Sequence, residues 1–459
     1  MSNSFKNKKV AVLGMGLEGK DLVKFLLKQK AQITIFDKKK KQELDLTGID
    51  RNKIKVVCGE RYLGSGLTGF DIIFRSPGIY PYLVQLIEAE RNDVTISSAS
   101  KLFFELCPAK IIGVTGTKGK GTTSTLIYEI LKASGKRVFL AGNIGKPYLK
   151  LLPILKKDDF VVLELSSFQL IDLKKSPQIA VVLNITLDHL DWHKDRDEYL
   201  KSKIRIVKYQ EKNDFAVLNA DYSTPRSFAK LSKGKIFYFS RRKKVRGCYV
   251  EKGRLILGIG EGKIQIGNAD KLLLRGKHNW ENVTAAICAS CLAGAQIKAI
   301  KKVSFSFKGL EHRLELVGRT YGVSFYNDSF ATNPQPTTAA VASFNEPITL
   351  ILGGSDKGLN YDGMAKVLAK KRNLRTVILI GEIADKIKKS LYKAGFKGKI
   401  IGLGKAAMKR IVKTSFYETP KGGVVLLSPA SASFDMFKDY KDRGNQFKEV
   451  VKSLRYEKN

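Results

Sequence analysis

The sequence alternates from end to end between short apolar, β-branched runs and longer stretches with helical periodicity. The runs are three to five residues long and lie at 10–13, 33–36, 54–57, 72–74, 111–114, 138–140, 161–163, 181–183, 348–352, 377–380 and 424–427. Short apolar runs separated by helical patterns of ten or more residues are typical of βαβ units, in which helices join parallel strands. The sequence therefore predicts an α/β protein built on parallel sheets.

Length and two changes of pattern divide the chain into domains. Its 459 residues correspond to two to four domains at roughly 100–200 residues each. A helical pattern ends at Cys107-Pro108, and the sequence KGLEHR at 308–313 separates a helical region from a strand that begins near Leu314. We expect three α/β domains over residues 1–107, 108–309 and 310–459. Residues 215–275 have short strands and turns, which predict a β-rich excursion inside the middle domain.

The strongly basic composition raises the question of a nucleic-acid partner. The chain has 82 Lys and Arg against 43 Asp and Glu, a formal net charge of +39. Only 20 of the cations are arginine, the residue best suited to bidentate recognition of phosphates and bases, and the lysines are spread over the whole chain. We therefore expect solvated lysine-rich faces and no nucleic-acid partner, with an excess charge that favours small anionic substrates such as nucleotides.

Targeting and cysteine patterns favour a cytoplasmic location. No apolar run approaches the roughly 20 residues that a membrane-spanning helix needs, so no membrane association is expected. The first residues lack the apolar core of a secretory signal, which favours a cytoplasmic location. The five cysteines form an odd, scattered set that indicates neither a disulfide framework nor a zinc site. We expect a monomer.

The most specific motif lies at residues 113–120, GVTGTKGK, between an apolar strand and a helical pattern. This is GxxxxGK in its required strand–loop–helix context. The glycines let successive N–H groups and the helix N-terminus face phosphate oxygens, and Lys120 can reach the terminal phosphates. Gly121 stands where a hydroxyl residue is usual, so Thr122 is the nearest hydroxyl for Mg²⁺. The motif predicts binding of a nucleoside triphosphate, against the alternative of an ordinary glycine turn.

A second glycine motif, GMGLEG at 14–19, joins the first strand to the first helix, and Asp37 ends the next strand. This spacing matches the dinucleotide fingerprint, although the same turn also serves other nucleotides or close packing alone. Glu18 is an unfavourable neighbour for an anionic ligand in such a loop.

Polar segments follow two of the apolar runs. Residues 164–169, ELSSFQ, come after the run at 161–163, and NITLDHLDWH at 184–193 comes after the run at 181–183. Open α/β sheets place ligands at the carboxyl ends of their strands. Glu164 and His189 are therefore expected to meet near the loop phosphates with Mg²⁺ between them, and a polar surface loop is the alternative.

Taken together, these motifs resemble the Mur ligase family of ATP-dependent amide-forming enzymes, over nearly the whole chain. The matching segments also include SPG at 76–78, AGNIG at 141–145, GKHNWEN at 276–282, EHRLE at 311–315, FYNDSFATNP at 325–334, ILGGSDKG at 351–358 and LLSPASASFDMFKDYKDRGNQF at 426–447. The last segment is typical of the branch that adds glutamate to UDP-N-acetylmuramoyl-L-alanine in peptidoglycan precursor synthesis. The resemblance implies a Rossmann-like amino-terminal domain, a central P-loop ATPase domain and a Rossmann-like carboxyl-terminal domain.

The family's chemistry implies ATP and Mg²⁺ as cofactors, an acyl-phosphate intermediate and a site completed by domain closure. Residue by residue, the resemblance implies catalytic roles for Lys120, His189 and Lys203. It implies ATP contacts from Gly116, Thr117, Lys118, Gly119, Lys120, Gly121, Thr122, Asn282, Arg313 and Asp328. It implies a metal neighbourhood of Thr122, Glu164, Ser166, His189 and Lys203.

The same resemblance implies how the two other substrates are held. The UDP substrate would be lined by Leu17, Glu18, Asp37, Ser76, Pro77, Gly78 and Asn143. The incoming D-glutamate would be surrounded by Thr332, Lys357, Ser433, Phe434 and Tyr440. Phe330 stands where the family pattern has lysine, so Lys357 is expected to carry the recognition of the side-chain carboxylate.

Lys203 follows Tyr199 by four residues in a helical stretch over 196–209 and therefore shares its helix face. The resemblance aligns Lys203 with a lysine that becomes carbamylated by CO₂, and a solvated lysine is the alternative. For the whole chain, the alternatives are a folylpolyglutamate synthase-like enzyme, which lacks the domain ahead of the phosphate loop, another Mur ligase, and a basic P-loop protein that binds nucleic acid.

Overall fold

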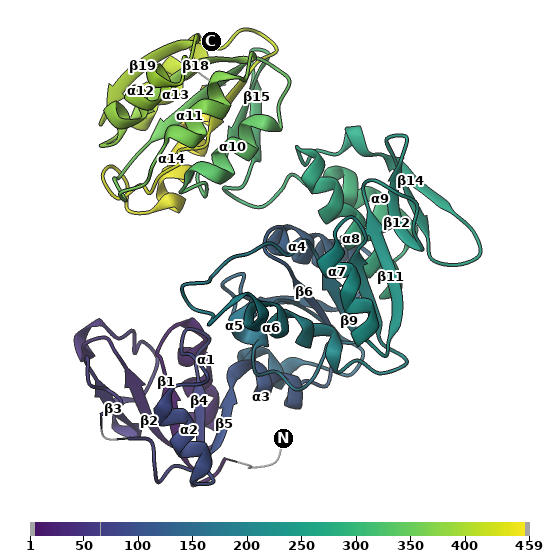
Figure 1. Cartoon of the computed structure of the whole chain (residues 1–459), viewed down its shortest axis with the longest axis vertical. Helices are drawn as coiled ribbons and strands as arrows, with labels where there is room; N and C mark the ends of the chain where they lie inside the picture. Colours follow the sequence, from purple (N-terminus) through teal and green to yellow (C-terminus); the bar gives the residue numbers. More distant parts are fainter. Residues whose placement is uncertain (1–4, 65, 455–459) are drawn as a thin grey trace. The chain divides into compact units, whose positions relative to one another are not determined.

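The computed structural model describes residues 5–64 and 66–454 (Figure 1). These residues form two compact units. The first contains the chain up to Ala269 together with Glu281–Ser304, and the second contains Asp270–Trp280 and the chain from Phe305 onward. The three domain ranges expected from the sequence stay a prediction, whereas the α/β class is confirmed, with three sheets among the described residues.

The amino-terminal sheet of the first unit has five parallel strands in the order β3-β2-β1-β4-β5 (Figure 1). The strands are β1 (Lys9–Leu13), β2 (Gln32–Asp37), β3 (Ile54–Cys58), β4 (Ile72–Arg75) and β5 (Thr95–Ser98). Helices α1 (Leu17–Lys28), α2 (Val84–Arg91) and α3 (Ala99–Leu106) connect or follow them. The strand order reverses between β1 and β4, so the loops that follow these two strands flank the switch point where such sheets bind ligands.

The second sheet of this unit has nine strands in the order β14-β13-β12-β11-β10-β9-β6-β8-β7. The strands are β6 (Lys110–Thr115), β7 (Val138–Gly142), β8 (Phe160–Glu164), β9 (Ile179–Val182), β10 (Phe215–Asn219), β11 (Lys235–Ser240), β12 (Gly247–Glu251), β13 (Arg254–Gly258) and β14 (Ile264–Asn268). All neighbouring pairs from β7 to β12 in this order are parallel. The pairs β12–β13 and β13–β14 are antiparallel. The region 215–275, expected as a β-rich excursion inside the middle domain, contains the strands β10 to β14, which extend the central sheet.

The helices around the nine-stranded sheet carry several of the predicted site residues. They are α4 (Lys120–Ala133), α5 (Ser167–Leu170), α6 (Arg196–Lys208), α7 (Ser223–Ser227), α8 (Lys277–Leu292) and α9 (Ile297–Ser306). Every residue of β8 is buried, as expected for a parallel strand covered on both faces. The apolar runs at 111–114, 161–163 and 181–183 correspond to the interior strands β6, β8 and β9 of this sheet.

The second unit contains a six-stranded sheet in the order β15-β16-β20-β17-β18-β19. Its strands are β15 (Glu315–Thr320), β16 (Val323–Asn327), β17 (Ile348–Gly353), β18 (Leu374–Ile380), β19 (Lys399–Gly404) and β20 (Val424–Leu427), and only β15 runs antiparallel. The helices are α10 (Pro334–Ala342), α11 (Asp362–Ala369), α12 (Ala384–Lys393), α13 (Met408–Tyr417) and α14 (Tyr440–Ser453). Strand β20 lies between β16 and β17, so the ends of these three strands are neighbours.

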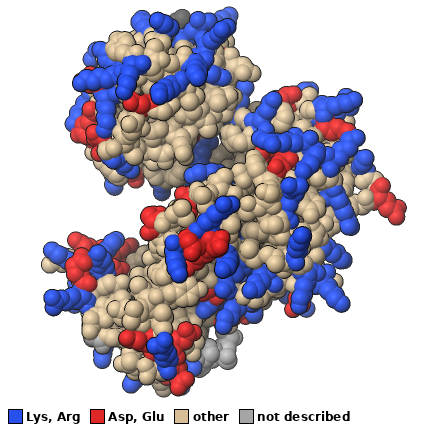
Figure 2. Space-filling model, viewed as in Figure 1, with Lys and Arg blue, Asp and Glu red and all other residues tan. Residues whose placement is uncertain are grey.

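Two surface properties bear on the expectations from composition. Lys and Arg side chains are spread over the visible face with Asp and Glu among them (Figure 2). Within residues 5–64 and 66–454, no helix is long and apolar enough to cross a membrane.

The cysteines need one correction. Cys288 and Cys291 have CxxC spacing on α8, so the set is less scattered than the sequence interpretation assumed. Burial raises the pKa values of Cys248, Cys288 and Cys291, which keeps these thiols protonated and weakly reactive. In the described part of the chain, no three metal-ligating side chains are grouped to hold a metal ion.

Candidate active site

Three neighbouring parallel strands of the nine-stranded sheet end at one edge and carry the polar segments expected from the sequence. Strand β6 lies between β8 and β9, and all three are paired in parallel. The phosphate loop (residues 113–120) begins in the last residues of β6, and the segment 164–172 begins at the last residue of β8. The segment 184–193 follows β9. The topology therefore brings together three segments that are separated in the sequence, as the strand-end argument predicted.

The phosphate loop owes its shape to glycine. Gly119 caps α4 in the left-handed region, at φ +86°, and a Cβ there would lie 2.2 Å from Asn282 Oδ1. No other residue fits this position without displacing Asn282. The structure thus places Asn282, which the sequence associated with ATP, directly against the loop.

Lys120 and Lys203 converge on one acceptor in this loop. Lys120 Nζ donates to the carbonyl oxygens of Gly116 (3.1 Å) and Thr117 (3.2 Å), and Lys203 Nζ donates to the same Gly116 oxygen (3.2 Å). Lys203 is 2% exposed and lies over the Tyr199 ring at 4.9 Å. Burial, reinforced by the nearby Lys120 charge, holds the pKa of the Lys203 ammonium well below its usual range. The alternative of a solvated Lys203 is wrong.

Thr117 locks the phosphate loop to the segment after β9. Its hydroxyl donates to the Thr186 carbonyl (2.9 Å) and accepts from the Thr186 amide (2.9 Å), and it lies 2.9 Å from the Tyr199 hydroxyl. The Thr117 amide donates to the Asn184 carbonyl (2.8 Å). These contacts fix the loop against α6, the helix that carries Lys203.

The oxygen donors predicted for a metal lie on β8 and its loop, and on α4. Glu164 is buried, and its Oε1 accepts from Asn143 Nδ2 at 2.8 Å. Ser166 caps α5 through a reciprocal pair of hydrogen bonds with Gln169. Gly121 is buried and Thr122 is half-buried at the first turn of α4, near Lys118, which is exposed. Carboxylate and hydroxyl oxygens are ligands that Mg²⁺ takes alongside water and phosphate oxygens.

The two histidines of segment 184–193 have opposite environments. His189 is exposed, adopts φ +55°, and its ring packs at 4.9 Å from that of Phe168. His193 is buried between Ser167 Oγ (2.9 Å from Nε2) and Glu198 Oε2 (3.3 Å from Nδ1), and burial lowers its pKa. The sequence interpretation assigned a role only to His189, although His193 lies in the same motif.

The amino-terminal glycine loop (residues 14–19) lies at the switch point of the five-stranded sheet and is lined by acidic groups. Asp37 accepts from the amides of Met15 (2.6 Å) and Lys39 (2.8 Å), and Ser76 Oγ donates to the Gly14 carbonyl (2.6 Å). Glu18 accepts from Tyr148 (2.8 Å) and Gln169 (2.5 Å). Burial raises the pKa of Glu18, although these two hydrogen bonds lower it in part. The Leu17 side chain is 64% exposed. Pro77 is half-buried, and Gly78 and Asn143 are exposed.

The remaining predicted residues belong to the second unit. Asp328 follows β16 and accepts from the Leu314 amide (3.1 Å) and Ser428 Oγ (2.7 Å), and burial raises its pKa to about 7. The Arg313 guanidinium lies 3.8 Å from the centre of the Phe330 ring.

The predicted amino-acid contacts differ in exposure. Phe330 also meets Tyr440, with ring centroids 5.1 Å apart. Ser433 is buried, Thr332 is half-buried, and Lys357 and Phe434 are exposed. These residues lie on loops after β16, β17 and β20 or at the start of α14, so the fold gathers them at one edge of the six-stranded sheet.

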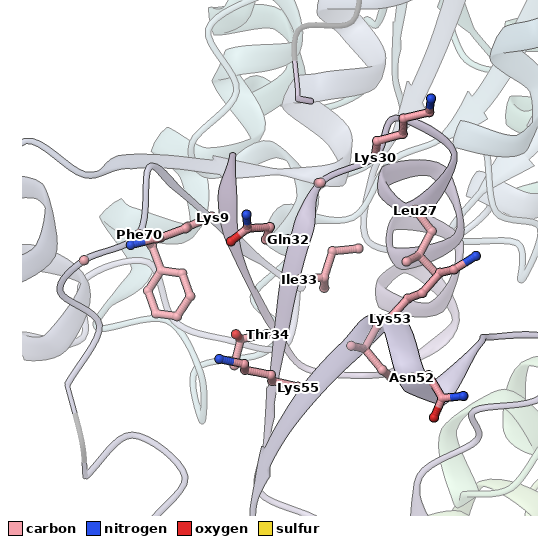
Figure 3. A pocket seen from close by; sticks show the side chains of 13 residues that line it. Lys9, Leu27, Lys30, Gln32, Ile33, Thr34, Asn52, Lys53, Lys55 and Phe70 are labelled. Carbon is pink, nitrogen blue, oxygen red and sulfur yellow. The ribbon is translucent and has the colours of Figure 1, made fainter. Parts of the chain in front are cut away.

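A separate hollow of about 760 Å³ lies at the amino ends of β1, β2 and β3, the opposite edge from the glycine loop (Figure 3). Lys9, Lys30, Lys53 and Lys55 surround it. Its described lining contains none of the predicted site residues. The hollow is therefore distinct from the candidate site.

Comparison with known families matches all three parts of the chain. A model of the Mur ligase MurD-like amino-terminal domain matches residues 8–98, a model of the Mur ligase middle domain matches residues 114–290, and a model of the Mur ligase glutamate ligase domain matches residues 312–431.

Similar proteins span the chain from end to end. A UDP-N-acetylmuramoylalanine–D-glutamate ligase from Acetivibrio thermocellus is 43% identical, over 98% of this chain and 97% of that protein. One from Symbiobacterium thermophilum is 40% identical, over 97% of this chain and 98% of that protein. The crystal structure of UDP-N-acetylmuramate–alanine ligase from Thermotoga maritima shares the fold, with a TM-score of 0.59 at 17% identity over 97% of this chain and all of that one. The chain belongs to the Mur ligase family.

Proposed function

We propose that this protein is the ligase that joins D-glutamate to UDP-N-acetylmuramoyl-L-alanine at the expense of ATP, a step of peptidoglycan precursor synthesis. The full-length identity of 37–43% to several D-glutamate ligases supports this activity over that of other Mur ligases. The observation that carries the chemistry is that the phosphate loop and Glu164 lie at adjacent strand ends, where the buried Lys203 of α6 reaches the Gly116 carbonyl of the loop.

The ligase needs the substrate carboxylate to become a better electrophile before an amine can displace its oxygen. The γ-phosphoryl group of ATP transfers to that carboxylate, and ADP leaves. The glutamate amine then attacks the acyl phosphate, and inorganic phosphate leaves as the amide forms. Phosphoryl transfer depends mainly on charge neutralisation and positioning. Lys120 and the amides at the start of α4 supply both for the β- and γ-phosphates.

Mg²⁺ fits the donor set of this edge. Glu164, Ser166 and the hydroxyl of Thr122 would hold the ion, together with phosphate oxygens and water, with His189 beside them. Mg²⁺ usually keeps several waters and takes one or two carboxylates, so a preformed protein cage is not required. When bound, it neutralises charge on the transferring phosphoryl group. Asn143, through its hydrogen bond to Glu164, orients this carboxylate.

Thr122 and its neighbour Thr123 provide a matched test of the hydroxyl that Gly121 leaves missing. Thr122 is half-buried, whereas Thr123 is buried and its hydroxyl lies 3.5 Å from Asn282 Oδ1. Because valine replaces only the hydroxyl by a methyl group, Thr122→Val should raise the Mg²⁺ concentration needed for half-maximal ATP use far more than Thr123→Val. Equal effects would show that Thr122 does not hold the metal.

Lys203 is proposed to act as a carbamate. Its amine is desolvated and repelled by Lys120, which favours the neutral form. The neutral nitrogen can attack CO₂, forming an N–C bond and releasing one proton, so that an anionic carbamate replaces a buried cation. An oxygen anion at this position would suit a second Mg²⁺ between Lys203 and His189.

The amino-terminal glycine loop is proposed to hold the UDP part of the substrate. Asp37, Leu17 and the loop at residues 76–78 line the switch point, which is the usual ligand position in such a sheet. Tyr148 and Gln169 both donate hydrogen bonds to the Glu18 carboxylate. This reduces the repulsion that its charge would otherwise exert on a diphosphate.

The second unit is proposed to bind the incoming amino acid and part of ATP. Lys357 is the proposed partner of the glutamate side-chain carboxylate. Arg313 covers the Phe330 ring, so a cation lies beside the position where the family pattern has lysine. Losing one partner of a desolvated charge pair costs about 2–5 kcal/mol. Lys357→Ala should therefore raise the KM for glutamate steeply and leave that for ATP nearly unchanged.

Phosphate release by the purified protein tests the whole proposal. The assay would contain ATP, Mg²⁺ and UDP-N-acetylmuramoyl-L-alanine, with D-glutamate, L-glutamate or another amino acid in parallel. We expect phosphate release and amide formation with D-glutamate at a rate far above the others. Equal turnover with L-glutamate, or turnover only with a different UDP-muramoyl precursor, would assign the chain to another Mur ligase activity.

A further inference from the structure

Arg75 is a fully buried arginine that the reaction chemistry does not use. It ends β4, directly before the SPG loop (residues 76–79), and it is 1% exposed. Its guanidinium contacts Asp172, in the segment that follows β8 of the nine-stranded sheet, with Nε 3.0 Å from Oδ2 and Nη2 2.9 Å from Oδ1. Lys101 Nζ lies 3.8 Å from the same carboxylate.

The other donors of Arg75 bind the two loops that flank it. Nη1 donates to the carbonyl oxygens of Ser76 (3.5 Å) and Ile79 (3.1 Å), both in the SPG loop. Nη2 donates to the carbonyl of Phe168 (3.1 Å) in the α5 segment (residues 164–172). A single planar, rigid group therefore fixes the backbone of both loops at once.

These two loops carry different proposed ligands. The SPG loop belongs to the proposed UDP site, and the α5 segment begins with Glu164 and Ser166 of the proposed metal neighbourhood. Two further contacts lie nearby: Gln169 Nε2 of the α5 segment donates to Glu18 Oε1 of the amino-terminal glycine loop (2.5 Å), and Trp192 Nε1 of segment 184–193 donates to the Gly78 carbonyl of the SPG loop (3.2 Å). The α5 segment is thus held to the substrate-binding sheet from several sides.

A buried ion pair is by itself a weak source of stability, because desolvation offsets much of the attraction. The role of the Arg75–Asp172 pair is better explained by the two segments that it holds in fixed positions, the SPG loop and the α5 segment. Moving one loop relative to the other would leave a buried guanidinium without some of its acceptors, and an unsatisfied buried charged donor costs more than the net worth of one hydrogen bond. The position of the SPG loop is consequently linked to that of Ser166 and Glu164.

We propose that Arg75 and Asp172 are positioning residues that couple binding of the UDP substrate to binding of the Mg²⁺–nucleotide. When the UDP substrate orders the SPG loop, Arg75 holds the α5 segment in the arrangement that the metal and the γ-phosphate need. The coupling is reciprocal, since each ligand must favour the other by the same factor. The proposal rests on the proposed function, because it assigns the two ligands to these loops.

The test compares two isosteric variants, Asp172→Asn and Asp159→Asn. Asp159 is also buried, pairs with Arg137 (3.5 Å) and accepts from the Lys156 amide (2.7 Å), so its contacts lie within the nine-stranded region. Asn keeps the shape of each side chain and removes its charge. Asp159→Asn therefore controls for the loss of charge at a buried, ion-paired carboxylate that joins no substrate loop.

The measurement is the Kd of Mg²⁺–AMP-PNP by calorimetry, with and without saturating UDP-N-acetylmuramoyl-L-alanine. In the wild type and in Asp159→Asn we expect the UDP substrate to tighten AMP-PNP binding about fivefold or more. In Asp172→Asn we expect less than about twofold tightening, with the Kd of each ligand alone within about twofold of wild type. A generally destabilised protein would instead bind both ligands more weakly.

Each outcome decides the matter. Wild-type coupling in Asp172→Asn, or no coupling in the wild type, would overturn the positioning role while phosphate release by the wild type still supports the proposed function. A wild type that does not bind the UDP compound would overturn both. Should Asp172→Asn fold poorly, Arg75→Lys provides the second test, because lysine can pair with Asp172 but cannot also bind the Ser76 and Phe168 carbonyls. It should likewise lose the coupling.

Discussion

The two glycine loops of the first unit share one plan and differ in charge. In each, a buried parallel strand leads through a glycine turn into a helix: β1 into α1 and β6 into α4. The amino-terminal loop has carboxylates around it, since Asp37 binds the Met15 amide and Glu18 lies in the first turn of α1. The phosphate loop has cations instead, with Lys120 and the buried Lys203 sharing the Gly116 carbonyl.

The difference shows that strand–glycine–helix geometry alone does not select a ligand. Both helix N-termini present backbone amides and a positive end of the helix dipole. In the first loop the protein's own carboxylates offset that positive end, which favours a ligand that offers hydroxyl or N–H donors there. In the second loop the lysines add to it, which favours a polyphosphate. Neighbouring side chains thus decide the chemistry of an otherwise shared backbone motif.

Of the changes that test the difference in charge between the two loops, the removal of Lys120 from the phosphate loop should have the largest effect. We expect Lys120→Ala to lower phosphate release on the order of 10³-fold, because the lysine charge is lost from the transferring phosphoryl group. Binding of the UDP substrate, measured by calorimetry, should stay near wild type. Lys132→Ala, on the same helix α4, is the matched control and should keep normal turnover. Normal turnover in Lys120→Ala would remove this loop from the mechanism.

The second cation tests whether a carbamate acts at the site. Lys203→Ala should lower activity on the order of 10²-fold and regain part of it with added formate or acetate, since a small carboxylate can replace the anionic group. Lys201→Ala, exposed on the same helix α6, should be unaffected. Wild-type protein should lose activity in CO₂-depleted buffer, and extra density on the Lys203 amine is expected in a crystal structure. Ordinary activity of Lys203→Ala without CO₂ would contradict the carbamate.

Asp328, a strand-end carboxylate of the second unit, extends the comparison to a group whose charge depends on pH. Its pKa is raised to about 7 from 3.8, so the folded state binds a proton more tightly than the unfolded state. This contribution to stability is fully present below about pH 4 and is lost as the pH rises through 7. Relative to Asp328→Asn, the wild type should lose on the order of 4 kcal/mol of unfolding free energy over that range. If the unfolding free energies of the wild type and of Asp328→Asn changed equally with pH, the raised pKa of Asp328 would be contradicted.

The smallest expected effects come from one methyl group in each loop, and they sharpen the comparison directly. A Cβ at Gly19 would lie 2.1 Å from the Gly14 carbonyl, and one at Gly119 would lie 2.2 Å from Asn282 Oδ1. Gly19→Ala should raise the KM for the UDP substrate roughly tenfold, and Gly119→Ala that for ATP by a similar factor, since strain of 1–2 kcal/mol corresponds to about that change. Gly16→Ala is the control, because nothing lies within 4 Å of its Cβ. If both variants affected the same substrate, the loops would not have separate ligands.

Much of the fold followed from local patterns, and the exceptions have identifiable causes. Short strands without a full apolar run, such as β5 and β19, were not predicted, because three of the four residues of β5 and all six residues of β19 are not fully buried. The region 215–275 was expected to be a β-rich excursion inside the middle domain, because its short strands have no long helices between them. Only the pairing of β10 with β9 shows that these strands continue the central sheet.

The sequence predicted the site residues that lie in motifs directly after a strand. It gave no indication of residues whose role depends on being buried against distant partners. Lys120, Glu164 and His189 follow from their places in motifs. His193 was overlooked because a buried histidine with two partners is identical in sequence to a surface one. Arg75 was overlooked because a lone arginine after a strand carries no signal until its acceptors are known.

The sequence by itself determined the α/β class, the strand runs, the two glycine loops and the family, because each depends on residues that are close in the chain. Only the tertiary structure decided which distant residues meet. Lys203 reaches the carbonyl of Gly116 across 87 residues, and Arg75 reaches Asp172 across 97. Such contacts are set by the order of strands in the sheets and by what becomes buried between them. Burial is also what turns Lys203 from an ordinary lysine into one with a depressed pKa, because desolvation disfavours its charge.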